Sequence, residues 1–242
     1  MRNFKFLAIA LLIAISVSSC IVVPKRISQH KTEVGHLNTV TAMKDFDGIS
    51  VAGAMNVVLV QGNGPSVQVK GDNKETFDQL VIYVEDNTLI IDSKDNAKFF
   101  GFMGSNSFDD ITVYVTMPSI KAIELAGSGN ITASEAINAD DVDVEIAGSG
   151  NIEFKGSFSC NRLSVSVAGS GDATFNKIKA NKITTSIAGS GNVAYYNMGV
   201  TNVDSEIAGS GNIILDGKVA HHTENIIGSG NVDTSHLLTA DS

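Results

Sequence analysis

The chain has 242 residues, of which 43% are hydrophobic and 18% charged, a composition typical of a folded globular protein rather than a disordered one. Twenty-three glycines, only 3 prolines and frequent Val, Ile and Thr favour β structure with tight turns. The formal net charge of −9 argues against a nucleic-acid partner, because binding phosphates requires clustered Lys and Arg.

The first 19 residues have the pattern of a secretory signal peptide. A short basic stretch ends at Lys5, an unbroken apolar run covers Phe6–Ile15, and small residues precede Cys20. This arrangement resembles the lipobox of bacterial lipoproteins and predicts that Cys20 begins the mature chain and carries acyl chains such as palmitate. Cleavage removes Arg2 and Lys5 and no acid, so the net charge changes from −9 to −11. An uncleaved anchor over residues 6–23 is the alternative, but three serines and a cysteine interrupt it.

Residues 20–44 form a polar, mixed segment with no sustained period, which we interpret as a tether. From residue 45 the sequence changes to short apolar alternations separated by turn residues, so 45–120 is predicted to be an N-terminal β section. The stretch Lys74–Leu80 could be one helical turn or a loop. The expected strands are Gly48–Val51, Val57–Val60, Val67–Val69, Leu80–Val84, Thr88–Asp92 and Ile111–Met117.

A glycine-rich turn occurs six times after residue 121, at intervals of 19 to 21 residues. Each copy follows a strand pattern of period two, as in Asp141–Ile146 and Leu163–Val167, and precedes a second short apolar stretch. The turn residues singled out here are Gly127, Gly129, Asn130, Gly148, Gly150, Asn151, Gly169, Gly171, Asp172, Gly189, Gly191, Asn192, Gly209, Gly211, Asn212, Gly228, Gly230 and Asn231.

A single unit of two short strands cannot bury its apolar side, so the copies must stack. A period near 20 with no helical segment predicts an all-β solenoid over residues 121–235, with equivalent residues in ladders. Glycine would supply the positive φ of each sharp turn, and the Asn side chains would stack into a hydrogen-bonded ladder. The alanines that precede the turns, from Ala126 to Ala208, are expected to line an inner corner.

The segment Ile49–Val57 aligns with Ile123–Ile131, and the match keeps the apolar, Ala-Gly and Asn positions. This match predicts that the N-terminal β section continues the same architecture, as a cap or as degenerate coils. Solenoids need such segments to protect their open ends.

Residues 45–233 resemble the bacterial family named putative auto-transporter adhesin, head GIN domain, which is common among envelope proteins of the Bacteroidetes. The resemblance lies in Phe46–Val57 with Gln61-Gly62, in Val113–Pro118, and in the GSGN and GSGD series. It implies a right-handed β-helix-like fold and an extracytoplasmic location, and it transfers no catalytic residues. The last copy departs from the pattern, because Ile227 stands where the others have alanine.

Other chemistries have little support in the sequence. Repeat-bound calcium would need more carboxylates than one Asp in six turns, and the pairs Asp109-Asp110 and Asp140-Asp141 are expected to be solvated. Glycan cleavage by outward acids such as Asp143 lacks a motif, and no arginine is predicted near an acidic cluster. The adjacent His221 and His222 should face opposite ways, so with His236 they do not mark a zinc site. Cys160 is expected to be a small corner residue, and no metal or cofactor is predicted.

We therefore expect a non-enzymatic, lipid-anchored outer-membrane lipoprotein that presents a β-solenoid for adhesion or binding. The expected partners are the membrane, through acylated Cys20, and a glycan or an envelope or host surface protein; a homo-oligomer stays open. A periplasmic self-assembling scaffold and, with less support, a carbohydrate-active β-helix enzyme are the alternatives. Surface export is often marked by acidic residues after the cysteine, and Ile21–Lys25 has none, which favours the periplasmic face.

Overall fold

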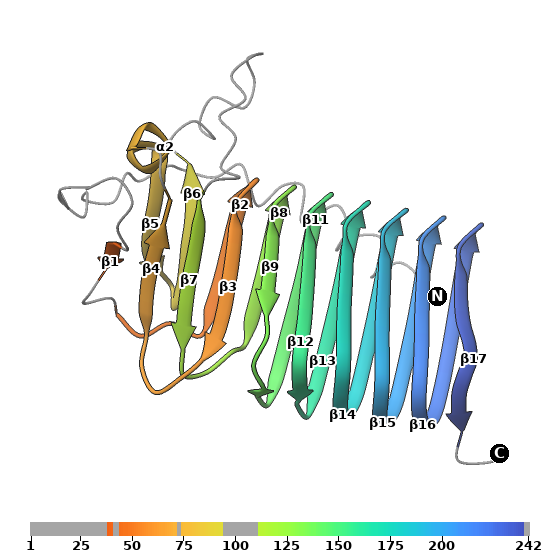
Figure 1. Ribbon diagram of the computed structural model, residues 1–242. Helices are drawn as coiled ribbons and strands as arrows, with labels where there is room; N and C mark the ends of the chain where they lie inside the picture. Colours follow the sequence, from red (N-terminus) through yellow and green to blue (C-terminus); the bar gives the residue numbers. More distant parts are fainter. Residues whose placement is uncertain (1–37, 41–43, 72–73, 94–110, 240–242) are drawn as a thin grey trace. The chain divides into compact units, whose positions relative to one another are not determined.

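The computed structural model describes residues 38–40, 44–71, 74–93 and 111–239. Within these ranges the chain is a β-solenoid of about 6 regular turns, with coils about 20 residues apart, as the sequence predicts. Figure 1 shows the coils as a row of strands in two layers, here named layer A and layer B. The signal peptide over residues 1–19, Cys20 and most of the predicted tether lie outside the described residues.

Each of the regular coils contributes one stretch of the chain to each layer. Layer A contains β5 (Leu80–Glu85), β6 (Thr88–Ser93), β2 (Gly48–Gly53), β8 (Ala122–Gly127), β11 (Asp141–Gly148) and β13 (Arg162–Gly169). Layer B contains β1 (Asn38–Val40), β4 (Ser66–Lys70), β7 (Thr112–Met117), β3 (Asn56–Gln61), β9 (Asn130–Ala133), β10 (Ile137–Asn138) and β12 (Asn151–Ser159). The long strands β14 (Asp172–Gly189), β15 (Asn192–Gly209) and β16 (Asn212–Gly228) pass from layer B into layer A, and β17 (Asn231–Thr239) ends layer B.

The order of coils in space differs from their order in the chain. Strand β2 pairs with both β6 and β8, and β3 pairs with both β7 and β9, so the coil 48–61 lies between two coils that follow it in sequence. The register places Gly53 beside Gly127 and Asn56 beside Asn130, which is the alignment predicted from the sequence. The stretch Lys74–Gln79 is a short helix, α2, rather than a loop.

The core fills the space between the two layers and is built from columns of equivalent residues. Phe154, Phe175 and Tyr195 stack from coil to coil in layer B, with ring centroids 4.6 and 5.2 Å apart. Tyr195 is fully buried, and its hydroxyl is 2.7 Å from the Thr185 hydroxyl on the facing layer. Burial raises the pKa of Tyr195, so the phenol stays neutral. A threonine thus stands where neighbouring coils have Val165 and Val144, and it gives the buried phenol its hydrogen-bond partner.

The alanine ladder is in register, but the prediction that it lines an inner corner is wrong. Ala126 and Ala208 are exposed, and the alanines of the coils between them are half-buried. In each coil the preceding residue, Leu125 or Ile207 for example, holds the inner position and is buried. Because side chains alternate along a strand, the alanine that follows points outward.

The two glycines of each turn serve different purposes. The first has a positive φ, for example 131° at Gly148 and 127° at Gly169, a conformation that other residues rarely adopt. The second, such as Gly150, has no positive φ, but a Cβ there would lie 2.5 Å from the carbonyl oxygen of Gly129 and 2.7 Å from Leu125 Cδ2. The backbone N–H groups of Ser149 and Gly150 donate to the Gly127 carbonyl at 2.8 and 2.9 Å, which draws successive turns together.

We expect Gly150→Val to destabilise the fold by about 3 kcal/mol, the upper part of the range for overpacking, because the obstructing Gly129 oxygen belongs to the backbone. Lys155 is exposed on β12, after the turn in the same coil. Lys155→Gln should change the free energy of unfolding by less than about 0.5 kcal/mol. Urea and thermal denaturation followed by circular dichroism measure both. Equal curves for the two variants would contradict the account of the turn.

Candidate functional site

The Asn side chains after the turns form a ladder on the outer surface. Asn151 Nδ2 donates to Asn130 Oδ1 at 3.1 Å, and Asn130 Nδ2 donates to Asn56 Oδ1 at 2.9 Å. In the coils nearer the C-terminus, Asn212 Nδ2 donates to Asn192 Oδ1 at 2.8 Å. Each of these amides donates toward the preceding coil, so each rung fixes the orientation of the next.

Asp172 interrupts this ladder. Its carboxylate accepts from both the backbone N–H and the side-chain amide of Asn192, at 2.9 and 2.8 Å. An ionised carboxylate has no hydrogen to donate, so Asp172 cannot continue the series to Asn151 Oδ1. The ladder is thus divided into two parts at this coil.

A charged patch lies on the outer side of layer A, over β11, β13 and the following strands. We define the patch as Asp141, Asp143, Asn161, Arg162, Ser164, Lys182, Thr184, Asp204 and Thr223. Most of these residues line one shallow depression, and all except Asn161 occupy two neighbouring columns of the sheet. One column contains Asp141, Arg162 and Lys182, so the same sheet position carries opposite charges in different coils.

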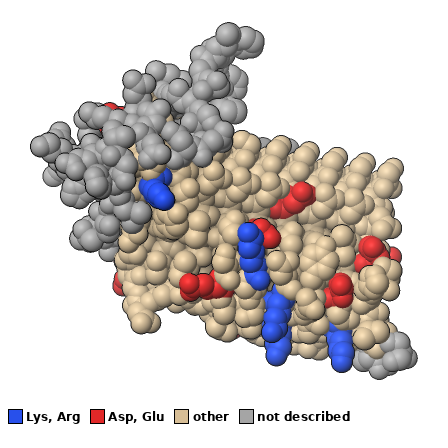
Figure 2. Space-filling model, viewed as in Figure 1, with Lys and Arg blue, Asp and Glu red and all other residues tan. Residues whose placement is uncertain are grey.

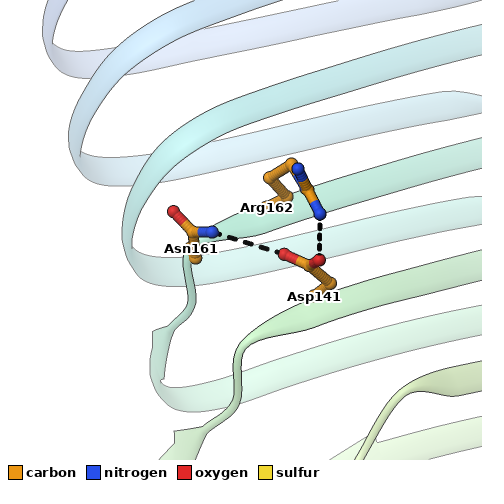
Figure 3. Close-up of polar contacts among 3 residues, drawn as sticks. All are labelled: Asp141, Asn161 and Arg162. Carbon is orange, nitrogen blue, oxygen red and sulfur yellow. Dashed lines mark hydrogen bonds and ion pairs between the residues drawn. The ribbon is translucent and has the colours of Figure 1, made fainter.

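The lower part of the patch is a group of three side chains, shown in Figure 3. Arg162 is ion-paired with Asp141, and Asn161 Nδ2 lies 3.5 Å from Asp141 Oδ1. The hydrogen bond and the charge of Asp141 raise the pKa of Arg162, which is charged in any case. The expectation that no arginine stands near an acidic cluster is therefore wrong, because the 21-residue offset between Asp141 and Arg162 is one coil.

The upper part of the patch links three coils. Lys182 Nζ is 2.7 Å from Asp204 Oδ2, and Thr223 donates to the other carboxylate oxygen at 2.6 Å. These two hydrogen bonds hold the pKa of Asp204 below its usual value, so the carboxylate stays ionised in mildly acidic solution. Exposed ion pairs of this kind contribute little to stability. Their main effect here is to hold donors and acceptors in fixed places on the surface.

An acidic column runs beside the patch. Glu124 and Glu145 are neighbours in register, and Asp143 lies in the adjacent column. Partial burial, followed by the charges of Glu124 and Asp143, raises the pKa of Glu145. The outer side of layer A is thus acidic toward β8 and mixed in charge toward β15.

The other residues singled out in the sequence do not form a catalytic site with this patch. Cys160 is half-buried at a coil corner, and burial, with Asp141 and Asp140 nearby, raises its pKa to about 11, so it is a thiol at neutral pH. His221 is exposed, whereas His222 turns inward, with Nε2 at 3.4 Å from Ser205 Oγ. Among the described residues, no group of three His, Cys, Asp or Glu side chains is placed to hold a metal ion. Asp109 and Asp110 lie outside the described ranges.

Figure 2 shows one face of the molecule, where basic and acidic side chains stand among uncharged residues. Neither sign of charge forms a large continuous area among the described residues on this face. In the part of the chain that the structure describes, no helix has the length and apolarity to cross a membrane.

Sequence reasoning noted Asp141 and Asp143 as outward residues but missed the patch they form with Arg162, Lys182 and Asp204. The signal was available in the repeat, because positions 141, 162 and 182 are equivalent once the turns are superimposed. Placing residues in columns, instead of along each strand, finds the opposite charges together.

The chain matches the model of the family described as "Putative auto-transporter adhesin, head GIN domain" over residues 45–176 and 164–242. Among solved structures, a "putative lipid binding protein" from Parabacteroides distasonis is similar, with 23% identity and a TM-score of 0.66, covering 83% of this chain and 97% of that one. A "putative adhesin" from Bacteroides fragilis has 19% identity and a TM-score of 0.63, covering 81% and 96%. At these identities the likeness shows the fold. No curated protein matches the sequence.

We expect Asp172→Asn to stabilise the fold by about 1 kcal/mol, the net contribution of one hydrogen bond, because the new amide can donate to Asn151 and still accept from Asn192. Glu135→Gln, at an exposed position, removes the same charge without completing a ladder. The two urea midpoints at pH 7 separate the effects. If Asp172→Asn increased the stability no more than Glu135→Gln, the interruption of the Asn ladder at Asp172 would have no energetic cost.

Proposed function

The chain belongs to the family described as "Putative auto-transporter adhesin, head GIN domain", and on that premise we propose that it is a non-enzymatic, lipid-anchored envelope protein that binds its ligand through the charged patch. The family and the similar structures are named for adhesion or binding, not for catalysis. The observation that carries the proposal is the patch itself, where two ion pairs hold donors and acceptors in register across successive coils.

The geometry of the patch favours an extended, hydrophilic ligand. Coils repeat about every 4.8 Å along the solenoid, so equivalent groups recur at a fixed spacing. Arg162 and Lys182 offer donors, Asp141, Asp143 and Asp204 offer acceptors, and the hydroxyl groups of the patch can do either. A glycan, which displays hydroxyl groups along a chain, can use both kinds of partner at several rungs. We therefore propose a glycan as the ligand, and a surface protein is the alternative outcome of the test.

The patch is suited to weak, multiple contacts. Its ion pairs are exposed, with side-chain exposures of 64% and 45% for Arg162 and Asp141, so a ligand can reach them without unfolding the surface. The sheet beneath is held by an apolar core, which keeps the rungs in place when a ligand binds. Affinity then depends on how many rungs the ligand contacts.

Binding should depend on layer A and not on the opposite layer. We expect the double variant Arg162→Ala and Lys182→Ala to lose at least about tenfold in binding to a glycan microarray, roughly 1.4 kcal/mol, because each lost cation removes hydrogen bonds to the ligand. The matched control is Lys155→Ala with Lys177→Ala, which removes two exposed lysines from layer B. Equal loss in both variants would refute the patch as the site. Wild-type protein that binds no glycan but binds envelope proteins would replace the glycan by a protein ligand.

Anchoring is proposed from the N-terminal sequence and should depend on Cys20. We expect Cys20→Ala to move the protein from the membrane to the soluble fraction, because the acyl chains provide the membrane contact. Cell fractionation measures this, with Cys160→Ala as the control for loss of a cysteine. Retention of Cys20→Ala in the membrane would contradict the anchor. Protease treatment of intact and lysed cells then separates a surface protein, lost from intact cells, from a periplasmic one.

A further inference from the structure

The two ends of the solenoid are finished differently. At the N-terminal end, antiparallel strands β5 and β1 close the layers, and Phe77, Leu80 and Ile82 pack against the core. At the C-terminal end, the last coil consists of residues 221–228 of β16 and the strand β17 (Figure 1). Among the described residues, no strand pairs with the outer edge of this coil. Its backbone N–H and C=O groups are therefore available to another chain.

Apolar side chains gather at this open end. Four large hydrophobic side chains are exposed among the described residues, and Ile226, Ile227 and Leu238 of the last coil are three of them. Ile226 belongs to an inner column in which Ile207 and Ile187 are 0 and 1% exposed, yet it is itself 37% exposed. Such a surface next to an unpaired sheet edge is typical of an interface.

Two polar residues at inner positions of the last coil indicate which partner would fit this edge. His222 and Glu224 occupy the inner positions that Val203 and Ser205 hold one coil below. They lie two residues apart on one strand, so both side chains point to the same side, with Thr223 between them pointing outward. When a second copy of this strand runs antiparallel to the first, the histidine of each copy can lie opposite the carboxylate of the other.

We propose that a second copy of this chain covers the last coil, with residues 221–225 of the two copies paired antiparallel about Thr223. A two-fold axis through Thr223 then places each His222 opposite Glu224 of the other copy, at the distance of directly opposed residues on one side of a sheet. The imidazole N–H donates to the carboxylate in both pairs, and Ile226 of each copy is withdrawn from water at the junction. The same axis brings the two β17 edges together in layer B.

This junction forms a closed dimer. A two-fold contact uses the same surface on both copies, so it consumes the C-terminal edge of each copy and adds no third copy. The N-terminal end has a different, antiparallel arrangement and takes no part in this contact, which distinguishes the dimer from a self-assembling scaffold. Thr223 is the one member of the charged patch in the last coil, whereas Lys182, Arg162 and Asp141 lie two, three and four coils from it, so a ligand can reach these three residues in the dimer.

Disulfide trapping in cells tests the register with the full chain. At the two-fold axis, Thr223 of one copy lies opposite Thr223 of the other. Directly opposed residues of antiparallel strands have Cα atoms about 4.5–5.5 Å apart, which is within the range of a disulfide. We expect Thr223→Cys to give a covalent dimer on a non-reducing gel. Thr184→Cys lies in the same column two coils from the edge and should stay monomeric. Dimer with both variants or with neither would overturn the proposal.

A charge exchange in the Thr223→Cys background tests the His–Glu pairing. Adding His222→Glu should lower the dimer fraction at least about fivefold, because two carboxylates then face each other at both positions. Adding Glu224→His to that variant restores an opposite pair and should restore the dimer. A fold defect is recognised by circular dichroism of each purified variant. Failure of the exchanged pair to recover while both variants remain folded would overturn the proposed register.

Discussion

The fold depends on how closely the backbones of successive turns approach each other. At the second glycine of each turn, a Cβ would lie within 2.5 Å of the carbonyl oxygen of the previous coil, too close for any side chain to be accommodated. At the first glycine, the same crowding is combined with a positive φ. Because these contacts repeat at the same place in each of the six glycine-rich turns, they keep those coils in one register. The inner columns, the Asn ladder and the charged patch all follow from that register.

Much of this arrangement could be predicted from the repeat. The period-two pattern located the strands, and the match between Ile49–Val57 and Ile123–Ile131 gave the register of the first coil. The position of that coil between β6 and β8 could not be predicted, because β4 to β7 carry no glycine turn to align. The prediction put Ala126 on the inner side because it considered the turn alone. The alternation of inward and outward side chains along the preceding strand places this alanine outward. The charged patch was missed because its members are separated by whole coils.

The core and the surface obey different demands in this architecture. Each inner residue has an equivalent above and below, so a change of size in one coil must be accommodated by its neighbours. Tyr195 shows how this occurs, since its phenol reaches the smaller Thr185 across the core and the next coil has the still smaller Ser205 in that position. Outer residues have no such restriction. Asp141, Arg162 and Lys182 can therefore differ from coil to coil and form a surface with its own chemistry.

The position of the coil 48–61 also affects how the molecule responds to mechanical force. Hydrogen bonds between coils run along the solenoid axis, so a pull on the C-terminal end strains one interface at a time and detaches coils in succession. The coil 48–61 is bonded on both sides, to β6 and β7 and to β8 and β9. Under load the chain would extend by about one coil per step while the end nearest residue 44 stays folded. The solenoid would then act as an extensible connection that yields gradually and keeps its N-terminal coils intact.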